Sequence, residues 1–321
     1  MRPRPLTIAA AVGLLGLTSA CGAAHKADNA AHAAAAIQKA VLSAPPAGSE
    51  GPVSGVSLRV ANMFSSSRTP GGPLDIYDVP LNNPNATTKP VPIISNVAYG
   101  AFSDYVHPHL LGTLTKTIEL EALPAGSDPV ANGSQAQGIG GLIDDGSGAQ
   151  ATIQLEGPSD TDTLLPGPLA GLSDSMIMEK GDDGQGGKGP AAPPVSGGGA
   201  QILASYAPAQ EMIPGAGGYF LFIDTSCTPP LNGDPNDTTL PDIFAASGGT
   251  PASSFAVFAT TAAAHHLTVA FDNSGTLPKC SDLGPKQGGT DVTLAAGQQA
   301  LALVYGTKNT DLHIAVGPIQ Q

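Results

Sequence analysis

From residue 56 onward, hydrophobic and polar residues alternate along short segments of the chain. Val56, Leu58 and Val60 are separated by single residues, so their side chains share one face of an extended backbone. Alternation of this kind predicts a half-buried β-strand. The same period recurs in seven later segments, at Leu74/Ile76, Ile118/Leu120/Ala122, Ala151/Ile153/Leu155, Tyr219/Leu221/Ile223, Leu267/Val269/Phe271, Leu301/Leu303/Tyr305 and Leu312/Ile314/Val316.

The segments between these expected strands are rich in Gly, Pro, Asn and Asp, which are the residues that β-turns require. Beyond residue 50, no segment has the 3.6-residue period of a convincing amphipathic helix. Many short strands with turn-rich connections are typical of β-sandwiches and β-barrels. The pattern therefore predicts an all-β protein.

Four segments in the first half of this β-rich region have counterparts in the second half. The separations lie between 141 and 150 residues, and the matched positions are Pro70 with Pro214, Ser103 with Ser253, Ile118 with Leu267 and Thr152 with Thr293. Such similar separations indicate tandem copies of one fold. A chance likeness between Gly-rich β-segments is the alternative.

The stretch between the two copies contains Gly, Pro and Asp and can bury almost nothing. It indicates a flexible linker, or alternatively a long surface loop inside one larger domain. We expect two tandem immunoglobulin-like β-sandwiches, with the first at residues 54–180, a Gly/Pro-rich linker at 181–199 and the second at 200–321.

The amino end resembles a bacterial lipoprotein signal. A basic start at Arg2 and Arg4 is followed by an apolar stretch from Leu6 to Leu17 and by small residues directly before Cys21. The stretch is short for a membrane span, which takes roughly 20 apolar residues. We expect residues 1–20 to be a signal peptide and Cys21 to carry lipid. An ordinary secretory signal with an unmodified cysteine is the alternative.

A lipidated Cys21 carries at least two acyl chains, which together make a stable membrane anchor. The following Ala/Pro-rich residues indicate a flexible tether, so residues 21–53 are expected to hold the lipidated cysteine and the tether. This predicts a protein that is lipid-anchored in the cell membrane and faces outside the cytoplasm.

The two other cysteines, Cys227 and Cys280, form an even pair. Outside the cytoplasm such a pair most often forms a disulfide, whereas two separate thiols are disfavoured by an oxidising compartment. The sequence therefore predicts a Cys227–Cys280 disulfide.

Charge limits the classes of partner. The formal net charge is −13, and removal of Arg2 and Arg4 with the signal peptide makes it more negative still. An acidic protein repels phosphate backbones, which argues against nucleic-acid binding. The expected partners are the membrane, through the lipid anchor, and a protein or cell-wall component of the envelope.

Three segments of the first half carry a recognisable order of motifs: Leu58-Arg59-Val60-Ala61-Asn62, then Pro73-Leu74-Asp75-Ile76-Tyr77, then Tyr99-Gly100-Ala101-Phe102-Ser103-Asp104-Tyr105. This order resembles the bacterial exported β-sandwich family catalogued as domain of unknown function 4397. The resemblance covers about 50 residues well and is weaker in the second half. It implies an immunoglobulin-like sandwich, export and tandem copies, and it implies no known chemistry.

The residues that carry this resemblance have structural interpretations. Arg59 is expected to pair with Asp75 across the sheet, and Gly100 to form a bulge or tight bend. The hydroxyl of Tyr99 or Tyr105 is expected to pin a loop. The full set of motif positions is Arg59, Asn62, Asp75, Tyr77, Tyr99, Gly100, Ser103 and Tyr105.

Two groups of side chains are candidates for metal binding. His107 and His109 are two residues apart, so in extended backbone both imidazoles point the same way. The Asp-rich loop around Asp234 and Asp237 offers oxygen donors of the kind that calcium favours. Solvated loop histidines and ordinary turn chemistry are the alternatives, and no resident cofactor is expected.

Catalytic motifs are missing from the sequence: it has no nucleophile elbow, no zinc-protease motif and no phosphate-binding loop. Glu119 and Glu121 share one face of an expected strand, but carboxylates are common on the outer face of an antiparallel sheet. We therefore expect a non-enzymatic envelope module that binds or scaffolds a partner. The alternative is an envelope protein that binds a metal or small ligand.

Overall fold

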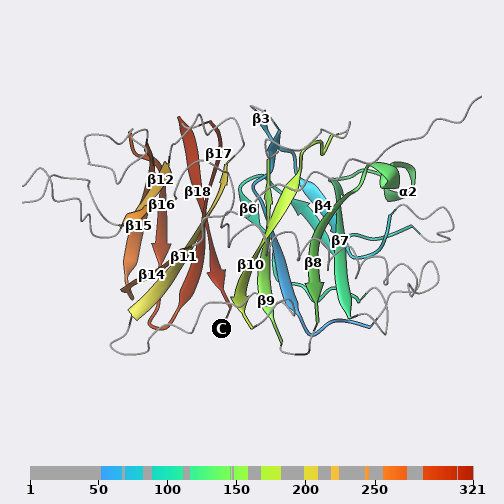
Figure 1. Ribbon diagram of the computed structural model, residues 1–321, viewed down its shortest axis with the longest axis horizontal. Coiled ribbons are helices and arrows are strands. Elements are labelled where there is room, and N and C mark those ends of the chain that lie inside the picture. Colours follow the sequence, from blue (N-terminus) through green and yellow to red (C-terminus); the bar gives the residue numbers. More distant parts are fainter. Residues whose placement is uncertain are drawn as a thin grey trace, which may run out of the picture.

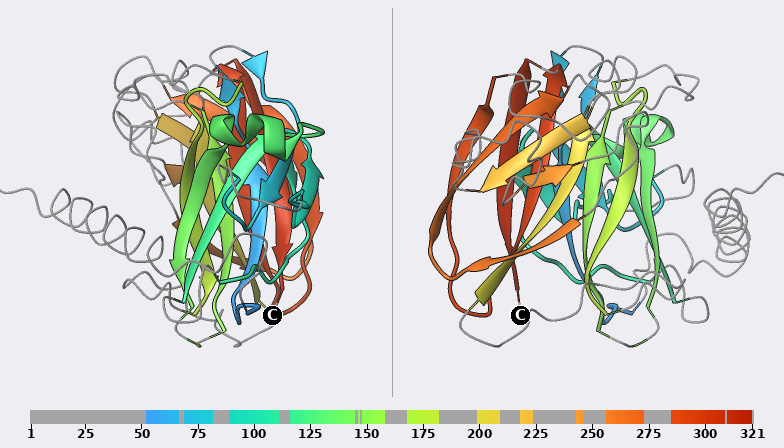
Figure 2. Two further views of the ribbon diagram at one scale, coloured as in Figure 1. Left: turned by 90° about the vertical axis from the view of Figure 1, so that its right-hand side faces the viewer. Right: turned by 60° about the vertical axis from the view of Figure 1, so that its left-hand side comes forward.

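In the described part of the chain, four four-stranded β-sheets form two β-sandwiches side by side (Figure 1). The computed structural model describes residues 52–66, 69–81, 89–110, 116–144, 146, 148–157, 168–181, 199–208, 218–223, 243–245, 256–272, 285–308 and 310–320. Most strands of both sandwiches lie roughly along one common axis, pointing up or down it, so the sheets pack as aligned layers (Figure 2).

The first sandwich pairs the sheet β10-β9-β1-β6 with the sheet β5-β4-β7-β8. A short hairpin, β2 (Ser65–Ser66) with β3 (Thr69–Pro70), lies outside these sheets. The eight sheet strands are β1 (Ser57–Asn62), β4 (Leu74–Tyr77), β5 (Ile94–Val97), β6 (Ala101–Phe102), β7 (Thr117–Pro124), β8 (Gln137–Ile143), β9 (Gln150–Glu156) and β10 (Ser173–Lys180).

Alternating apolar residues build the core of this sandwich. Leu58 and Val60 of β1 face Ile76 of β4 and Leu120 of β7 in one buried cluster. Burial of these side chains is the main favourable term, at about 25 cal/mol per Å² of apolar surface. The two-residue period in the sequence therefore identified the core-facing side of these strands correctly.

A single helical turn, α2 (Pro129–Asn132), connects β7 to β8 together with the 3-10 turn η1 (Gly133–Gln135). The Asp128 side chain accepts a hydrogen bond from the Val130 N–H and so caps this turn. Among the described residues, no helix is long and apolar enough to cross a membrane.

The second sandwich pairs the sheet β14-β11-β17-β18 with the sheet β13-β12-β15-β16. Its core contains Ile202, Leu221, Val269 and Ala302. The strands are β11 (Gly199–Pro208), β12 (Gly218–Ile223), β13 (Ile243–Ala245), β14 (Ala256–Thr261), β15 (Ala264–Asp272), β16 (Gln287–Thr293), β17 (Gln299–Lys308) and β18 (Asp311–Ile319).

Both sandwiches have the same topology. The parallel pair β1·β9 corresponds to β11·β17, and the antiparallel partners β6 and β10 correspond to β14 and β18. In the other sheets, the order β5-β4-β7-β8 corresponds to β13-β12-β15-β16. The chain is therefore all-β with tandem sandwiches, as the sequence predicts, and it is immunoglobulin-like in the general sense of two packed, mainly antiparallel sheets.

The sequence matches between the halves are only partly right. Ile118 and Leu267 lie in the corresponding strands β7 and β15. The match of Thr152 with Thr293 is wrong, because Thr152 lies in β9 whereas Thr293 ends β16. The counterpart of β9 is β17, and each begins with Gln-Ala, at Gln150 and Gln299. Ser253 and residues 182–198 lie outside the described residues, so the exact domain boundaries stay a prediction.

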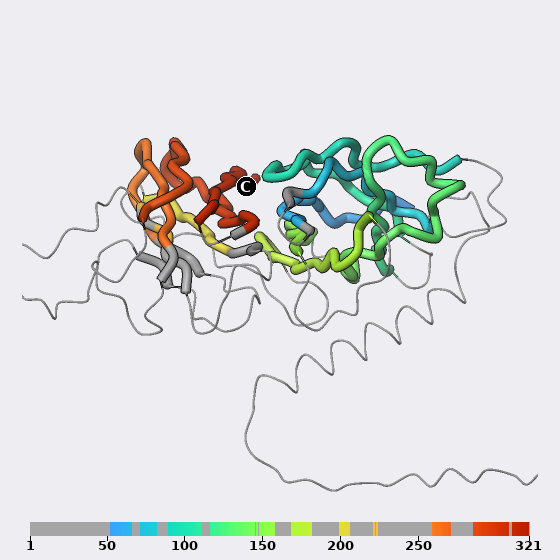
Figure 3. Tube along the Cα trace, turned by 90° about the horizontal axis from the view of Figure 1, so that it is seen from above, coloured from blue at the N-terminus to red at the C-terminus, as the bar shows by residue number. Residues whose placement is uncertain are grey.

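The two sandwiches meet through one sheet each, and the carboxyl end of β18 lies between them (Figure 3). An apolar cluster fills this junction, with Ala61 and Ile177 from the first sandwich and Leu203, Leu301 and Leu303 from the second. All five are buried. The sheet β10-β9-β1-β6 is thus covered on both faces, which explains why nearly every residue of β1 and β9 is buried.

Close approach at this junction depends on glycine at two positions. A Cβ atom added to Gly317 of β18 would lie 2.7 Å from Arg59 Nη1 and 3.1 Å from the Phe102 ring. A Cβ atom at Gly100, whose φ is +77°, would lie 2.3 Å from the Tyr305 hydroxyl. Each sandwich therefore presents a glycine to a large side chain of the other.

We predict that Gly317→Ala destabilises the protein by about 1–3 kcal/mol, because the added methyl overpacks the junction. Chemical denaturation of wild type and variant measures the change. Gly138→Ala in β8 is the matched control, since a Cβ atom there meets nothing within 4 Å. Equal stability of the Gly317→Ala variant and wild type would contradict the described junction.

Candidate functional site

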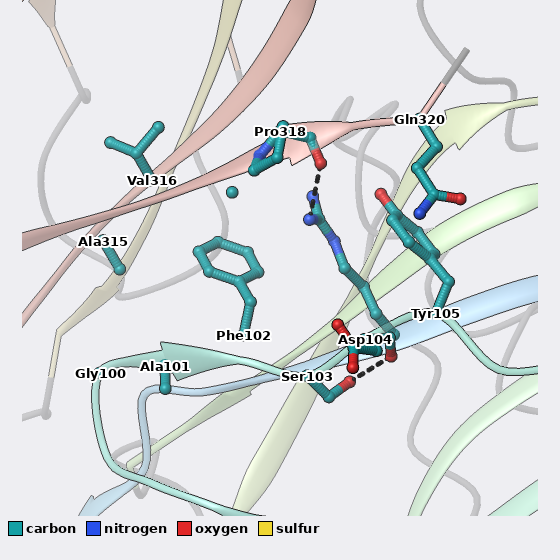
Figure 4. Close-up of a pocket in the computed structure, with 12 residues that line it drawn as sticks. Gly100, Ala101, Phe102, Ser103, Asp104, Tyr105, Ala315, Val316, Pro318 and Gln320 are labelled. Atoms are coloured by element: carbon teal, nitrogen blue, oxygen red, sulfur yellow. Dashed lines mark hydrogen bonds between the residues drawn. The ribbon is translucent and has the colours of Figure 1, made fainter. Parts of the chain in front are cut away.

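Arg59 of β1 lies at the centre of the junction and is only 2% exposed. Its guanidinium donates to Thr152 Oγ1 at 2.8 Å and to Glu179 Oε1 at 2.7 Å, both in the same sheet. The third hydrogen bond crosses to the second sandwich, where the Pro318 carbonyl of β18 accepts from Nη1 at 2.9 Å (Figure 4). Arg59 therefore joins the two sandwiches.

Two aromatic rings enclose the same guanidinium. The Cζ atom of Arg59 lies 4.6 Å from the centre of the Phe102 ring and 4.7 Å from that of Tyr105. Both distances allow cation–π attraction. The Tyr105 hydroxyl donates to Glu179 Oε2 at 2.5 Å and accepts from the Gln150 amide at 3.1 Å. Burial and then the Glu179 charge raise the pKa of Tyr105, so this phenol stays protonated.

The predicted ion pair between Arg59 and Asp75 is wrong. Arg59 lies in the sheet β10-β9-β1-β6, whereas Asp75 lies in β4 of the facing sheet. Asp75 instead accepts from the main-chain N–H groups of Asn96 and Gly126, at 2.8 and 2.9 Å. The partner of Arg59 is Glu179, which follows it by 120 positions.

The remaining motif residues stabilise loops and the core. The Asn62 amide donates to the carbonyls of Val97 and Gly72, and Ser103 Oγ accepts from the Val60 N–H. The Tyr77 ring packs with Leu81 and Leu123 on the outer face of β4 and β7.

The expectations for Gly100 and for the motif tyrosines hold. Gly100 forms the predicted tight bend, with a positive φ before β6. Tyr105 pins its loop through its hydroxyl, as predicted for one of the two tyrosines. The Tyr99 ring instead packs edge-on against Tyr305 of the second sandwich, with centres 5.2 Å apart.

A cavity of about 390 Å³ opens where the edge of the first sandwich meets the edge of the second. One wall is the segment from Gly100 to Tyr105, and the other is β18 from Ala315 to Pro318, with Gln320. Phe102 and Tyr105 point from one wall toward Pro318 and Gln320 of the other (Figure 4). Arg59 contributes to the lining, but its charge is matched by Glu179.

A second cavity of about 460 Å³ lies on the other side of β6, within the first sandwich. It is lined by Ile93 to Ala98 around β5 and by the segment from Ala101 to Asp104. The two cavities therefore share β6 as a common ridge, and Asp104 is the exposed carboxylate on it.

The structure gives His107 and His109 separate hydrogen-bond partners. His107 Nδ1 lies 2.9 Å from the Val56 carbonyl, and His109 Nδ1 lies 2.8 Å from Asp78 Oδ2. In the part of the chain that the structure describes, no three His, Cys, Asp or Glu side chains gather as metal ligands. The predicted metal site thus gains no support from the geometry of these histidines.

Several predicted positions lie outside the described residues. These are the lipidation site Cys21, the disulfide pair Cys227 and Cys280, and the loop positions Asp234 and Asp237. The signal peptide, most of the tether and most of the linker lie there too. All of these stay predictions from the sequence.

Glu119 and Glu121 share one face of β7, as the two-residue period predicts. The Glu121 carboxylate accepts from the Leu81 N–H at 2.8 Å. Burial raises the pKa of both carboxyls, and the neighbouring Glu121 charge raises that of Glu119 further. This pair is half-buried on the outer face of the first sandwich, on a strand that lines neither cavity.

Comparisons with known proteins find only weak likenesses to solved structures. No family model matches the chain, and no curated protein matches it. A solved structure of a "putative cell adhesion protein" from Bacteroides ovatus is 10% identical, covers 85% of this chain and 97% of its own, and has a TM-score of 0.22. A second one, from Bacteroides uniformis, is 11% identical, covers 82% and 96%, and also has a TM-score of 0.22. Neither likeness carries an argument about function at such scores.

We predict that Arg59→Met destabilises the protein by about 3–5 kcal/mol, because Glu179 is left buried without its partner charge. Urea denaturation measures the loss. The double variant Arg59→Met/Glu179→Gln should recover part of it, since no uncompensated charge remains. An Arg59→Met variant as stable as wild type would show that the pair is not buried in solution.

We also predict a pH-dependent effect of Glu119→Gln. The folded state holds the Glu119 proton more tightly than the unfolded chain, whose pKa is near 4.5, so stability falls as the pH rises through the raised folded-state pKa. The variant should therefore gain free energy of unfolding relative to wild type at pH 7 and lose this advantage near pH 4. An advantage that is constant across this range would refute the assignment.

Proposed function

We propose that this protein is a non-enzymatic module of the cell envelope that binds or scaffolds a partner. The proposal includes export, lipid attachment at Cys21 and a position facing outside the cytoplasm, which rest on the sequence of the amino end. The resemblance of the first half to exported β-sandwich domains is part of the same proposal.

The observation that carries the binding role is the hollowed edge where the two sandwiches meet. Cavities of about 390 and 460 Å³ flank β6, and residues from both sandwiches line the first of them. Hollows of this size accept side chains or a small ligand. We call this surface the junction edge, defined by β5, β6 with the following residues to Tyr105, and the end of β18.

The buried contacts of Arg59 support a fixed geometry for this surface. Both walls of the first cavity touch the same guanidinium, through Phe102 and Tyr105 on one side and through Pro318 on the other. A surface held in place before binding loses less conformational freedom when a partner docks. The tandem arrangement thus gives the junction edge a shape that one sandwich alone lacks.

The test is a pull-down from envelope extract with the lipidated full-length protein as bait. We predict a reproducible partner that is captured by wild type and lost with Ala101→Phe, because Ala101 lines both cavities and a phenyl group there would occupy the cavity that its side chain faces. Val130→Phe is the control, since Val130 is 63% exposed on α2 and lines neither cavity.

Two results would count against the proposal. Capture of no reproducible partner by wild type would remove the binding role. Retention of the partner by Ala101→Phe would place the binding surface away from the junction edge.

A further inference from the structure

β6 lies at the edge of the sheet β10-β9-β1-β6. Within the part of the chain that the structure describes, β6 pairs with β1 alone, and Phe102 lies opposite Ala61. The Ser103 N–H, directly after Phe102, donates to the Val60 carbonyl, and the Gly100 N–H, two positions before Phe102, donates to the Asn62 carbonyl. In an antiparallel ladder the position between such bonds turns its N–H and C=O away from the partner strand. The N–H and C=O of Phe102 therefore point to the open side of β6.

The two cavities lie on opposite faces of this edge. One face of the sheet β10-β9-β1-β6 packs on the core shared with β5, and the other packs on the second sandwich at β18. The cavity of about 460 Å³ opens on the β5 side, and that of about 390 Å³ opens on the β18 side. A strand added beside β6 would run between them, and its side chains would alternate from one cavity to the other.

The charge of this edge favours a basic partner segment. Asp104 is exposed and lines both cavities. Arg59 is the basic residue in the lining, and its charge is held by Glu179 at 2.7 Å. In the part of the chain that the structure describes, no salt bridge engages the Asp104 carboxylate.

We propose that the junction edge binds an extended, basic segment of a partner protein as an additional strand beside β6. Its main chain pairs with the N–H and C=O of Phe102, its alternate side chains enter the two cavities, and a Lys or Arg reaches Asp104. This is strand addition, in which main-chain hydrogen bonds supply affinity and flanking pockets supply specificity. The inference rests on the proposed binding function and names the chemistry of the partner.

The probe is a synthetic seven-residue peptide of alternating Thr and Val with Lys at its centre, titrated into the full-length protein. We expect binding with slowed hydrogen exchange at the Phe102 amide. N-methylation of the alternate amides that face β6 should weaken binding about fivefold or more, because a main-chain hydrogen bond is lost at each. N-methylation of the other alternate set should leave binding unchanged.

Charge is tested separately. Asp104→Lys should weaken binding of the Lys-centred peptide by roughly two- to fivefold, as expected for the loss of an exposed ion pair. The same substitution should strengthen binding of a Glu-centred peptide by a similar factor. The substitution keeps the Asp104 carbonyl that accepts from Ser103 Oγ. Asp291→Lys is the matched control, because Asp291 is an exposed carboxylate in β16, away from the junction edge. This variant should bind both peptides as tightly as wild type.

Several results would overturn the inference. Binding that tolerates both N-methylated sets, or exchange protection outside β6, would exclude strand addition. Reversible dimerisation that the peptide competes away would assign the edge to a second copy of this chain instead. If an envelope partner is captured and is sensitive to Ala101→Phe while no peptide binds, the inference fails and the proposed function stands.

Discussion

The structure depends on the buried ion pair between Arg59 and Glu179. Their side chains are 3% and 0% exposed, and a buried charge is tolerated only where its partners satisfy it. Thr152, Tyr105 and Gln150 complete the hydrogen bonds within the first sandwich. The last acceptor, the Pro318 carbonyl, follows Arg59 by 259 positions and belongs to the second sandwich. The polar network of the first sandwich is thus completed by the docking of the second.

The two sandwiches share a topology but differ in the surfaces that meet. With Gln150 and Gln299 taken as equivalent, the strand registers place Leu203 at the position of Arg59 and Leu301 at that of Thr152. The first sandwich therefore presents a polar network, and the second presents buried leucines to the same junction. Because the two surfaces differ, each sandwich fits the other one within the same chain. Two identical surfaces would instead favour association between separate copies of the chain. This pairing of the two sandwiches gives the junction edge its shape.

Local patterns in the sequence were enough to predict the strands and the side of each strand that faces the core. The alternation at Leu58, Leu120 and Ile153 was correct because a half-buried strand needs one apolar face. The bend at Gly100 was correct because only glycine adopts its positive φ at no steric cost. The tandem arrangement followed from the spacing of similar segments, although Thr293 was assigned to the wrong counterpart strand.

The junction could not be predicted, because periodicity gives the face of a strand but not the sheet or domain that covers it. Arg59 and Asp75 were expected to pair across neighbouring strands of one sheet, yet they lie in different sheets. The buried Glu179 lies in a polar-looking strand end, Met178-Glu179-Lys180, and nothing local marks it as the partner of Arg59. The one available signal was an arginine in the middle of an apolar strand, which requires a buried counter-charge somewhere in the fold.

The most direct test of this account is whether the two sandwiches tumble as one body. Backbone ¹⁵N relaxation of the full chain reports the rotational correlation time of each sandwich separately. The buried junction around Arg59 predicts one common value, as expected for a rigid body of both sandwiches together. Two shorter, independent values would contradict it, because the sandwiches would then move as separate domains and the junction edge would have no fixed shape.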